Sequence, residues 1–258
     1  MSAQKNDKAL IDWQDLPAAI GLLTRLPVPV DMDRAQARGA AAAWAYPLAG
    51  LVVALAQIVV AALCLWLGLT PAIAAAVVLL TAIVITGAMH EDGLADCADG
   101  FWGGWDRDRR LEIMKDSRIG AYGVIALILW LILRWSCLSV LLAGPGWAGA
   151  LVAVAMVSRA GMVALMAALP HARPGGLSRS VGRPTARTAG LAALLALVGS
   201  LASLGLGALG FAVLMAGAAG LCGLIARAKI GGQTGDVLGA TQQVGEVVLL
   251  IGLVSAMP

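Results

Sequence analysis

The chain has 258 residues and a formal net charge of +3; 60% of its residues are hydrophobic and 13% are charged. Soluble domains carry about 25% charged residues, so the composition excludes an ordinary soluble protein and indicates an integral membrane protein. It also lacks a basic stripe with interleaved aromatic residues, which excludes nucleic acid as a partner. We expect one all-α domain over residues 1–258, built as a polytopic bundle of membrane helices.

Residues 1–43 are expected to form a cytoplasmic or interfacial N-terminal segment, whose first 15 residues are mixed in charge and lack the pattern of a cleaved signal peptide. It contains one apolar stretch, Leu16–Leu26, that is followed directly by Pro27. This stretch is shorter than the roughly 20 residues that a spanning helix needs. We therefore expect it to lie at the membrane interface or to form a re-entrant segment.

Seven longer apolar segments follow, and each is predicted to cross the membrane. The fifth and sixth are separated only at Gly205-Leu206-Gly207, because glycine pairs interrupt helices. Without that break the number of spans falls to six. The predicted spans are Trp44–Leu67, Pro71–Met89, Ile119–Leu142, Trp147–Leu169, Thr188–Leu204, Leu206–Ala226 and Val237–Met257.

The basic residues indicate how the chain is oriented. Sixteen of the 18 Lys and Arg residues fall before the first span or in alternate loops, while the other connections carry no charge. Lys and Arg concentrate in cytoplasmic loops, so we expect a cytoplasmic N-terminus in a bacterial inner membrane. The polar loops would then face the cytoplasm together, next to membrane lipid, where they can form one site.

An acidic segment, residues 90–118, lies between the second and third predicted spans and holds eight of the 15 Asp and Glu residues. Asp92, Asp96 and Asp99 follow an i, i+4, i+7 spacing, which places them on one stripe of a helix. Like charges on one stripe repel each other unless a cation binds them, and oxygen ligands suit Mg²⁺. We predict a cytoplasmic catalytic loop that binds Mg²⁺; the alternative is a solvated loop rich in Asp and Gly.

Basic and polar residues on both sides of this stripe are candidates for binding an anion. His90 could contact a phosphate or cap the preceding span. The run 107–118 reads as an amphipathic helix on anionic headgroups, but that reading explains its final residues less well. Lys and Arg beside carboxylates and a metal would bind a diphosphate. These final residues are Lys115, Asp116, Ser117 and Arg118.

Two later loops are predicted to join the same site. The first is the flexible basic loop around Arg173, which could close over an anionic ligand or only follow the charge bias of cytoplasmic loops. The second is the glycine-rich turn 231–236, which leads into a helix N-terminus that offers free N–H groups to an anion. In that turn Thr234 could bind substrate and Asp236 could complete the metal site, although either residue could be an ordinary N-cap.

Two arginines lie inside predicted spans. Arg134 is followed by Trp135 and could extend its charged end toward the interface. Arg159 lies about three turns from the cytoplasmic end of its span, so it needs a partner within the bundle.

The motifs resemble those of the cobalamin synthase family (adenosylcobinamide-GDP ribazoletransferase). The resemblance follows the expected order along nearly the whole chain, and its central motif is long and specific. Glu91 and Cys97 depart from the pattern, which has an apolar residue and a Thr at these positions. The matching runs are Thr24–Pro29, Gly87–Gly100, Leu111–Gly123 and Gly232–Ala240.

The resemblance implies a reaction in which a hydroxyl of α-ribazole, or of its 5′-phosphate, attacks the cobinamide-linked phosphorus of adenosylcobinamide-GDP. GMP leaves and a phosphodiester remains, which is the last assembly of the vitamin B12 nucleotide loop; members of the family are Mg²⁺-dependent membrane proteins. Asp92 and Asp96 are the first expected metal ligands, and Asp99 and Asp236 are further expected members of the metal site. Asp99 is the expected general base, with Asp96 as its rival. Lys115 and Arg118 are expected to hold phosphate oxygens as GMP departs.

Two other functions remain open at this stage. A CDP-alcohol phosphotransferase of phospholipid synthesis uses similar chemistry, but its Ala-Arg pair is missing after Gly100. A cation-coupled transporter would hold its site near the middle of the membrane and often shows internal repeats, which are absent here. The sequence does not decide the phosphorylation state of the acceptor, the number of metal ions or the oligomeric state.

Overall fold

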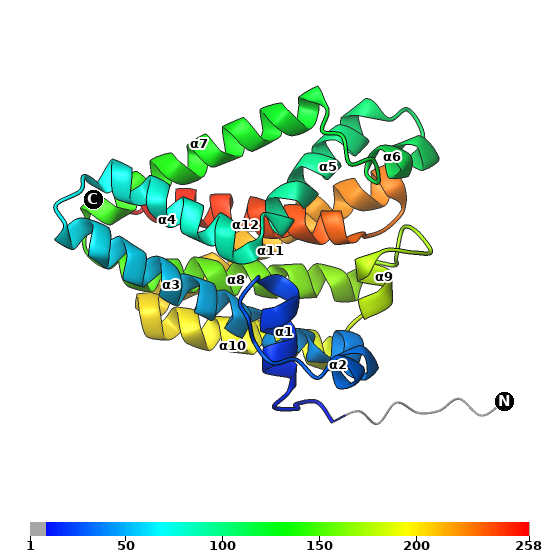
Figure 1. Ribbon diagram of the computed structural model, residues 1–258, viewed down its shortest axis with the longest axis horizontal. Helices are drawn as coiled ribbons and strands as arrows, with labels where there is room; N and C mark the ends of the chain where they lie inside the picture. Colours follow the sequence, from blue (N-terminus) through cyan, green and yellow to red (C-terminus); the bar gives the residue numbers. More distant parts are fainter. Residues whose placement is uncertain (1–8, 258) are drawn as a thin grey trace.

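The computed structural model describes residues 9–257, which form a bundle of helices (Figure 1). Within that range the only β pairing is an isolated bridge between His171 and Gln233. The elements are α1 (Asp15–Leu23), α2 (Met32–Arg38), η1 (Gly39–Ala45), α3 (Tyr46–Trp66), α4 (Pro71–Thr86), α5 (Met89–Gly103), α6 (Arg107–Ile113), α7 (Ala121–Ala143), α8 (Trp147–Ala168), α9 (Leu177–Val181), α10 (Ala186–Leu204), η2 (Gly205–Gly207), α11 (Ala208–Ile230) and α12 (Gly235–Ser255).

The all-α membrane architecture predicted from the sequence is confirmed. Over the described residues, five helical segments are long and apolar enough to cross a membrane, or six if α4 and α5 form one broken span. One of the five, Ala186–Ile230, is interrupted at Gly205, where φ is +58° and η2 separates α10 from α11. The predicted break is therefore confirmed as a break between helices. The predicted number of seven crossings and the cytoplasmic N-terminus stay predictions.

Helix α8 is the centre of the bundle. Helices α3, α10, α11 and α12 pack around it, and most of its residues are buried. α10 and α11 pack against each other, and Ala196 of α10 and Ala212 of α11 line one apolar cavity with Gly161 of α8. A helix surrounded by other helices needs apolar side chains on every face, which explains why the sequence of α8 shows little amphipathic pattern.

The chain bends by 88° between α4 and α5. Gly87 and Ala88 both have positive φ, +64° and +57°, and Ala88 is the one non-glycine residue with positive φ in the described chain. The positive φ favours glycine at position 87, and a Cβ there would lie 2.4 Å from Nε of Arg25, whose side chain crosses the bend. The predicted second span, Pro71–Met89, ends at Thr86 for this reason. The bend turns α5 toward α12 and α7.

The acidic segment 90–118, expected as a polar connection that contains helical stretches, folds largely into α5 and the short helix α6. Figure 1 shows α6 and α9 at the same end of the bundle, opposite the connection between α3 and α4. The charged connections are therefore gathered at one end, as the charge distribution predicted. At this end α1 is fixed by buried Asp15, which pairs with Arg38 at 2.5 Å and accepts a hydrogen bond from Trp44 Nε1 at 2.7 Å. Lys5 and Lys8, which support the predicted orientation, lie outside the described residues.

Candidate functional site

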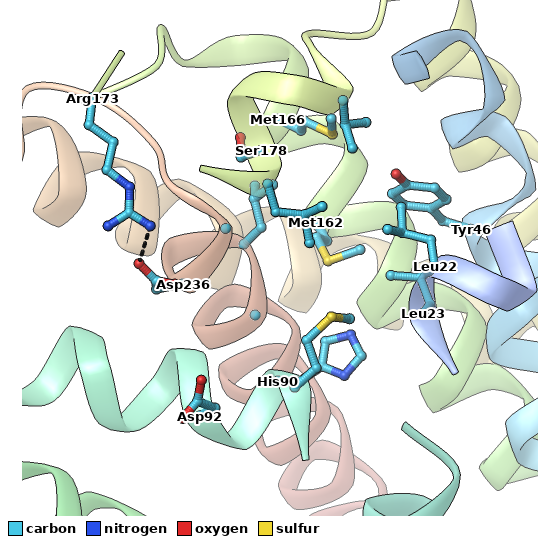
Figure 2. A pocket seen from close by; sticks show the side chains of 16 residues that line it. Leu22, Leu23, Tyr46, His90, Asp92, Met162, Met166, Arg173, Ser178 and Asp236 are labelled. Carbon is cyan, nitrogen blue, oxygen red and sulfur yellow. Dashed lines mark hydrogen bonds and ion pairs between the residues drawn. The ribbon is translucent and has the colours of Figure 1, made fainter. Parts of the chain in front are cut away.

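A cavity of about 250 Å³ lies at this polar end, between α1, α3, α5, α8, α9 and α12 (Figure 2). One side of its wall is mainly apolar and the other side is charged. Leu22, Leu23 and Tyr46 lie on one side, whereas Arg173 and Asp236 lie on the other. The further lining residues that matter here are His90, Asp92, Met162, Met166 and Ser178. Four residues predicted from the sequence, His90, Asp92, Arg173 and Asp236, thus share one cavity although they come from three separate segments.

Close contact between α5 and α12 brings two of the carboxylates into this cavity. A Cβ on Gly93 would lie 2.7 Å from the Asp236 carbonyl oxygen, and a Cβ on Gly239 would lie 3.2 Å from His90 Cα. Each glycine therefore permits one helix backbone to approach the other. Asp92 lies next to Gly93 on α5, and Asp236 lies in the first turn of α12.

The turn 231–236 ends in a capped helix with an ion pair. Thr234 Oγ1 accepts a hydrogen bond from Val237 N at 3.3 Å, as an N-cap residue does. Thr234 Oγ1 also donates to Asp236 Oδ2 at 3.1 Å, and the same oxygen lies 3.3 Å from Arg173 Nη2. Arg173 Nη1 is buried and has no hydrogen-bond partner in the described chain. Arg173 therefore still has a donor available for an anion.

The three aspartates of the acidic stripe have different surroundings. The helix predicted from their spacing is confirmed as α5. Asp92 is exposed and Asp96 is half-buried, and the charges of Asp92 and Asp236 act on the Asp96 carboxyl. Asp99 is buried, and its two oxygens accept hydrogen bonds from Gly120 N at 2.7 Å and Gly123 N at 2.9 Å.

Asp99 is thus a tertiary cap for the first turn of α7, whose free N–H groups need acceptors. Its expected role as general base is not supported by these contacts, because both oxygens already accept backbone hydrogen bonds. A second glycine pair explains how it fits: a Cβ on Gly120 or Gly123 would lie 2.5 Å or 2.4 Å from the Asp99 carboxylate. The spacing along α5 could not reveal that the stripe turns toward another helix at this residue.

His90 is 1% exposed, and its Nε2 has no hydrogen-bond partner in the described chain. The preceding span, α4, is closed at its end by the backbone N–H of Gly87, so capping by His90 finds no support in the described residues. The ring lines the cavity below Met162, on the side of Leu22 and Leu23 (Figure 2). A buried ring nitrogen without a partner is costly, so this geometry favours a ligand contact for His90.

The residues of the loop before α7 are outside the cavity. Lys115, Asp116, Ser117 and Arg118 are all exposed, and none lines the cavity. Arg118 pairs with Asp116 at 2.8 Å, and its hydrogen bonds hold the pKa of Asp116 below the ordinary value. The roles predicted for these four residues in binding the diphosphate stay predictions.

Helix α6 is shorter than the predicted amphipathic run and is fastened to the protein. Arg107 donates from Nε to Ile230 O at 3.0 Å and from Nη2 to Ala172 O, and Arg110 donates from Nη1 to Lys229 O at 3.1 Å. These hydrogen bonds go to backbone carbonyls at the end of α11 and in the loop after α8, so α6 is held against the protein. The predicted contact of the run 107–118 with lipid headgroups stays a prediction. Arg109 is exposed and pairs with Glu112 at 2.7 Å.

A second polar contact joins the Arg173 loop to the turn before α12. Ala172 N donates to Gln233 O at 2.9 Å, and Gln233 N donates to Pro170 O at 2.8 Å. Ser178 Oγ donates to Gln233 Oε1 at 2.5 Å, and His171 Nδ1 lies 3.1 Å from Gln233 Nε2. Burial lowers the pKa of His171, as do the charges of Arg179 and Arg183. Ser178 and Gln233 were not among the predicted site residues, since nothing in the local sequence pairs these two loops.

A buried network of charges lies beside the cavity, between α5, α7, α8 and α12. Arg134 contacts Glu91 at 2.9 Å and Glu246 at 2.6 Å, and Arg159 lies 3.6 Å from Glu246. Gln243 donates to Glu91 at 3.0 Å. The interfacial position suggested for Arg134 is wrong, because its side chain is 3% exposed and paired inside the bundle. The partner that Arg159 required is Glu246, and Glu91, the departure from the family pattern, is a member of the network.

Comparisons with known proteins agree with the motifs. A family model described as cobalamin-5-phosphate synthase matches residues 15–254. A Bradyrhizobium diazoefficiens protein named adenosylcobinamide-GDP ribazoletransferase is 47% identical over 239 residues, which cover 92% of each chain. Proteins of the same name from Brucella ovis and Brucella canis are 43% identical over 259 residues, covering 94% of this chain and 97% of theirs. No solved structure matches.

Proposed function

Because this chain belongs to the cobalamin-5-phosphate synthase family, we propose that it transfers the cobinamide phosphate of adenosylcobinamide-GDP to α-ribazole, or to α-ribazole 5′-phosphate, and releases GMP. It is a transferase of the assembly of the cobalamin nucleotide loop. The observation that carries the proposal on this chain is the meeting of Asp92, Asp236 and Arg173 in one cavity. The family match leaves no support for the two alternatives, a CDP-alcohol phosphotransferase and a transporter.

The bonds that change define what the cavity must do. A ribose hydroxyl oxygen of the acceptor forms a bond to the cobinamide-linked phosphorus, while the bond from that phosphorus to the bridging oxygen breaks and GMP leaves with this oxygen. The hydroxyl proton must pass to a base. Positive charge must stabilise the phosphate oxygens during transfer, because phosphoryl transfer depends mainly on positioning and charge neutralisation.

Three groups of this chain are suited to hold the phosphates. Arg173 has a buried Nη1 with no partner in the described chain, and Nη2 bound to Asp236. The start of α12 provides backbone N–H groups and the positive end of a helix dipole. His90 Nε2, also without a partner in the described residues, lines the same cavity. Lys115 and Arg118 keep their predicted role in holding departing phosphate oxygens. Asp116 and Ser117 keep theirs in binding substrate, from the exposed loop outside the cavity.

Asp96 is the general base in this proposal. It is half-buried on α5, one turn after Asp92, and its burial, followed by repulsion from Asp92 and Asp236, favours its protonated form. A carboxylate surrounded by like charges accepts a proton more readily, which is the property a base needs. Asp99, the other candidate, is committed to the N–H groups of α7.

The carboxylates also suit Mg²⁺. In the described residues no group of three His, Cys, Asp or Glu side chains is arranged to hold a metal ion by itself. Mg²⁺ in phosphoryl-transfer sites is usually held by one or two carboxylates together with substrate phosphates, which matches a cavity with two carboxylates and Asp96 near them. We assign Asp92 and Asp236 as ligands, with Asp96 as a third candidate. The ion would supply charge neutralisation on the diphosphate.

The location of the chain belongs to the proposal as well. Long apolar helices and the gathering of charged connections at one end favour a bacterial cytoplasmic membrane with the cavity open to the cytoplasm. Reporter fusions after residues 68 and 104 test this orientation. A periplasmic reporter should be active only at the first position, and the opposite pattern would invert the topology.

The direct test uses detergent-purified protein, adenosylcobinamide-GDP, α-ribazole and Mg²⁺, and follows the release of GMP together with the corrinoid product. We expect GMP to appear only when the acceptor is present. GMP release without an acceptor would indicate hydrolysis, and no release with either acceptor would contradict the proposed transfer. Parallel assays with α-ribazole and its 5′-phosphate identify the preferred acceptor.

A further inference from the structure

A second cavity, of about 420 Å³, adjoins the first. It is formed by α1, α2, η1 and α9, and it shares Leu22, Tyr46 and Val181 with the cavity that holds the carboxylates. These three side chains form the boundary between the two spaces. Figure 2 shows Leu22 and Tyr46 on the side of the first cavity that faces away from Arg173 and Asp236.

The two cavities differ in chemistry. Among the described residues that line the second cavity, none is charged, and the only polar side chains are Gln36, Tyr46 and Ser180. Small apolar side chains, including Ala18, Ala35 and Ala42, make up much of the wall. Such a lining binds an apolar group well but leaves a strongly polar group without hydrogen bonds.

The backbone around the second cavity is closely fitted. Gly39 has a φ of +50°, and a Cβ at this position would lie 2.7 Å from Val181 O. α9 therefore rests directly on the start of η1. Since α9 also carries Ser178, which lines the first cavity, one short helix contributes to the walls of both spaces.

We propose that the second cavity binds the benzimidazole base of the acceptor nucleoside, so that the ribose passes Tyr46 and presents its hydroxyl to the carboxylate side of the first cavity. This inference rests on the proposed function. A benzimidazole ring is flat, aromatic and uncharged, and its one free ring nitrogen needs a single donor, which the amide of Gln36 can supply. Guanine would leave several donors and acceptors unpaired among alanines.

The other large group of the two substrates is also excluded by size. A corrin ring with its side chains takes up more space than either the first or the second cavity provides. The corrinoid must therefore lie outside both cavities, with only its phosphate reaching Arg173. The acceptor is then the substrate that can enter between α1 and α9. The division of the wall into an apolar and a charged side matches a nucleoside that has an apolar base and a reactive ribose.

The test uses substitutions that narrow the second cavity, and it measures KM for each of the two substrates separately. Ala18→Leu and Ala35→Leu place a larger side chain at half-buried positions of its wall, and Ala37→Leu makes the same change at an exposed position of α2 that does not line it. We expect the first two variants to raise KM for α-ribazole about tenfold or more. KM for adenosylcobinamide-GDP should stay within about twofold of the wild-type value, and Ala37→Leu should behave like the wild type.

Several results would overturn the proposal. Unchanged KM for α-ribazole in both variants would show that the base binds elsewhere, and an equal rise in both Michaelis constants would fit a lipid chain or a general distortion instead. If thermal unfolding shows that a leucine variant is not folded, Ala35→Val provides the smaller change. Wild-type protein that releases no GMP with either acceptor contradicts the proposed function itself, so the two failures are distinguishable.

Discussion

The Arg134 guanidinium on α7 lies 2.6 Å from the Glu246 carboxylate on α12, although both residues belong to segments apolar enough to cross a membrane. The same guanidinium contacts Glu91 on α5 at 2.9 Å. Arg134 therefore connects the helix that carries Asp92 and Asp96 with the helix that carries Asp236. A buried charge that loses its partner is strongly destabilising, so this contact fixes the relative position of α5 and α12.

Removal of Arg134 should unfold or loosen the bundle. Arg134→Leu leaves Glu91 and Glu246 buried without their cation, and loss of one partner of a buried pair costs about 3–5 kcal/mol. We expect a large fall in the midpoint of thermal unfolding in detergent. Arg109→Ala, which breaks an exposed pair with Glu112, should cost less than about 1 kcal/mol. Equal stability of the two variants would show that the buried network contributes little.

Asp92→Asn and Asp236→Asn should each reduce the rate of GMP release about 100-fold or more without unfolding the protein, because these residues provide the carboxylates of the cavity. Asp108→Asn is the matched control, since its side chain is 89% exposed and outside the cavity. Turnover and thermal unfolding should be measured on the same preparations. Near-normal turnover in either cavity variant would remove that residue from the proposed site.

Chelation of divalent cations should stop the reaction reversibly. We expect no GMP release in excess EDTA and full recovery when Mg²⁺ is added back, because the diphosphate and the carboxylates otherwise repel each other. Asp96→Asn should raise the Mg²⁺ concentration needed for half-maximal activity if Asp96 is a ligand. If it is only the base, kcat should fall while the Mg²⁺ dependence stays the same. Activity that persists in EDTA would argue against a metal.

Two substitutions of Asp99 distinguish a structural role of this residue from a catalytic one. Asp99→Asn keeps one acceptor oxygen for the N–H groups of Gly120 and Gly123, whereas Asp99→Ala keeps none. An unpaired buried donor costs about 1–3 kcal/mol, so we expect Asp99→Ala to be clearly less stable than Asp99→Asn. Asp99→Asn should retain much of its turnover. A loss as large as that of Asp92→Asn would restore Asp99 as the base.

Arg107 should affect the site from a distance. Its hydrogen bonds to Ala172 O and Ile230 O hold the segments that lead to Arg173 and Asp236. Arg107→Ala should raise KM for adenosylcobinamide-GDP several-fold, and Arg107→Lys should not rescue it, because lysine lacks the forked donor. Arg109→Ala again serves as the control. A full rescue by lysine would mean that only the positive charge of Arg107 matters.

Much of the fold followed from the sequence alone. The long apolar segments begin and end within a few residues of the predicted positions, and the break at Gly205-Leu206-Gly207 is present as η2. These features depend on local properties: the length of an apolar run, the helical period of Asp92 and Asp96, and the conformational freedom of glycine. The family motifs are also continuous in the sequence, so they could be recognised without any structure.

The tertiary structure decided which of these residues meet. It turned Asp99 toward the start of α7, paired Arg173 with Asp236, and buried Arg134 between Glu91 and Glu246. Each of these contacts joins residues more than 20 positions apart, on helices and loops that only the packing of the bundle brings together. Periodicity along one helix specifies a face, but only the packing of several helices specifies what that face touches.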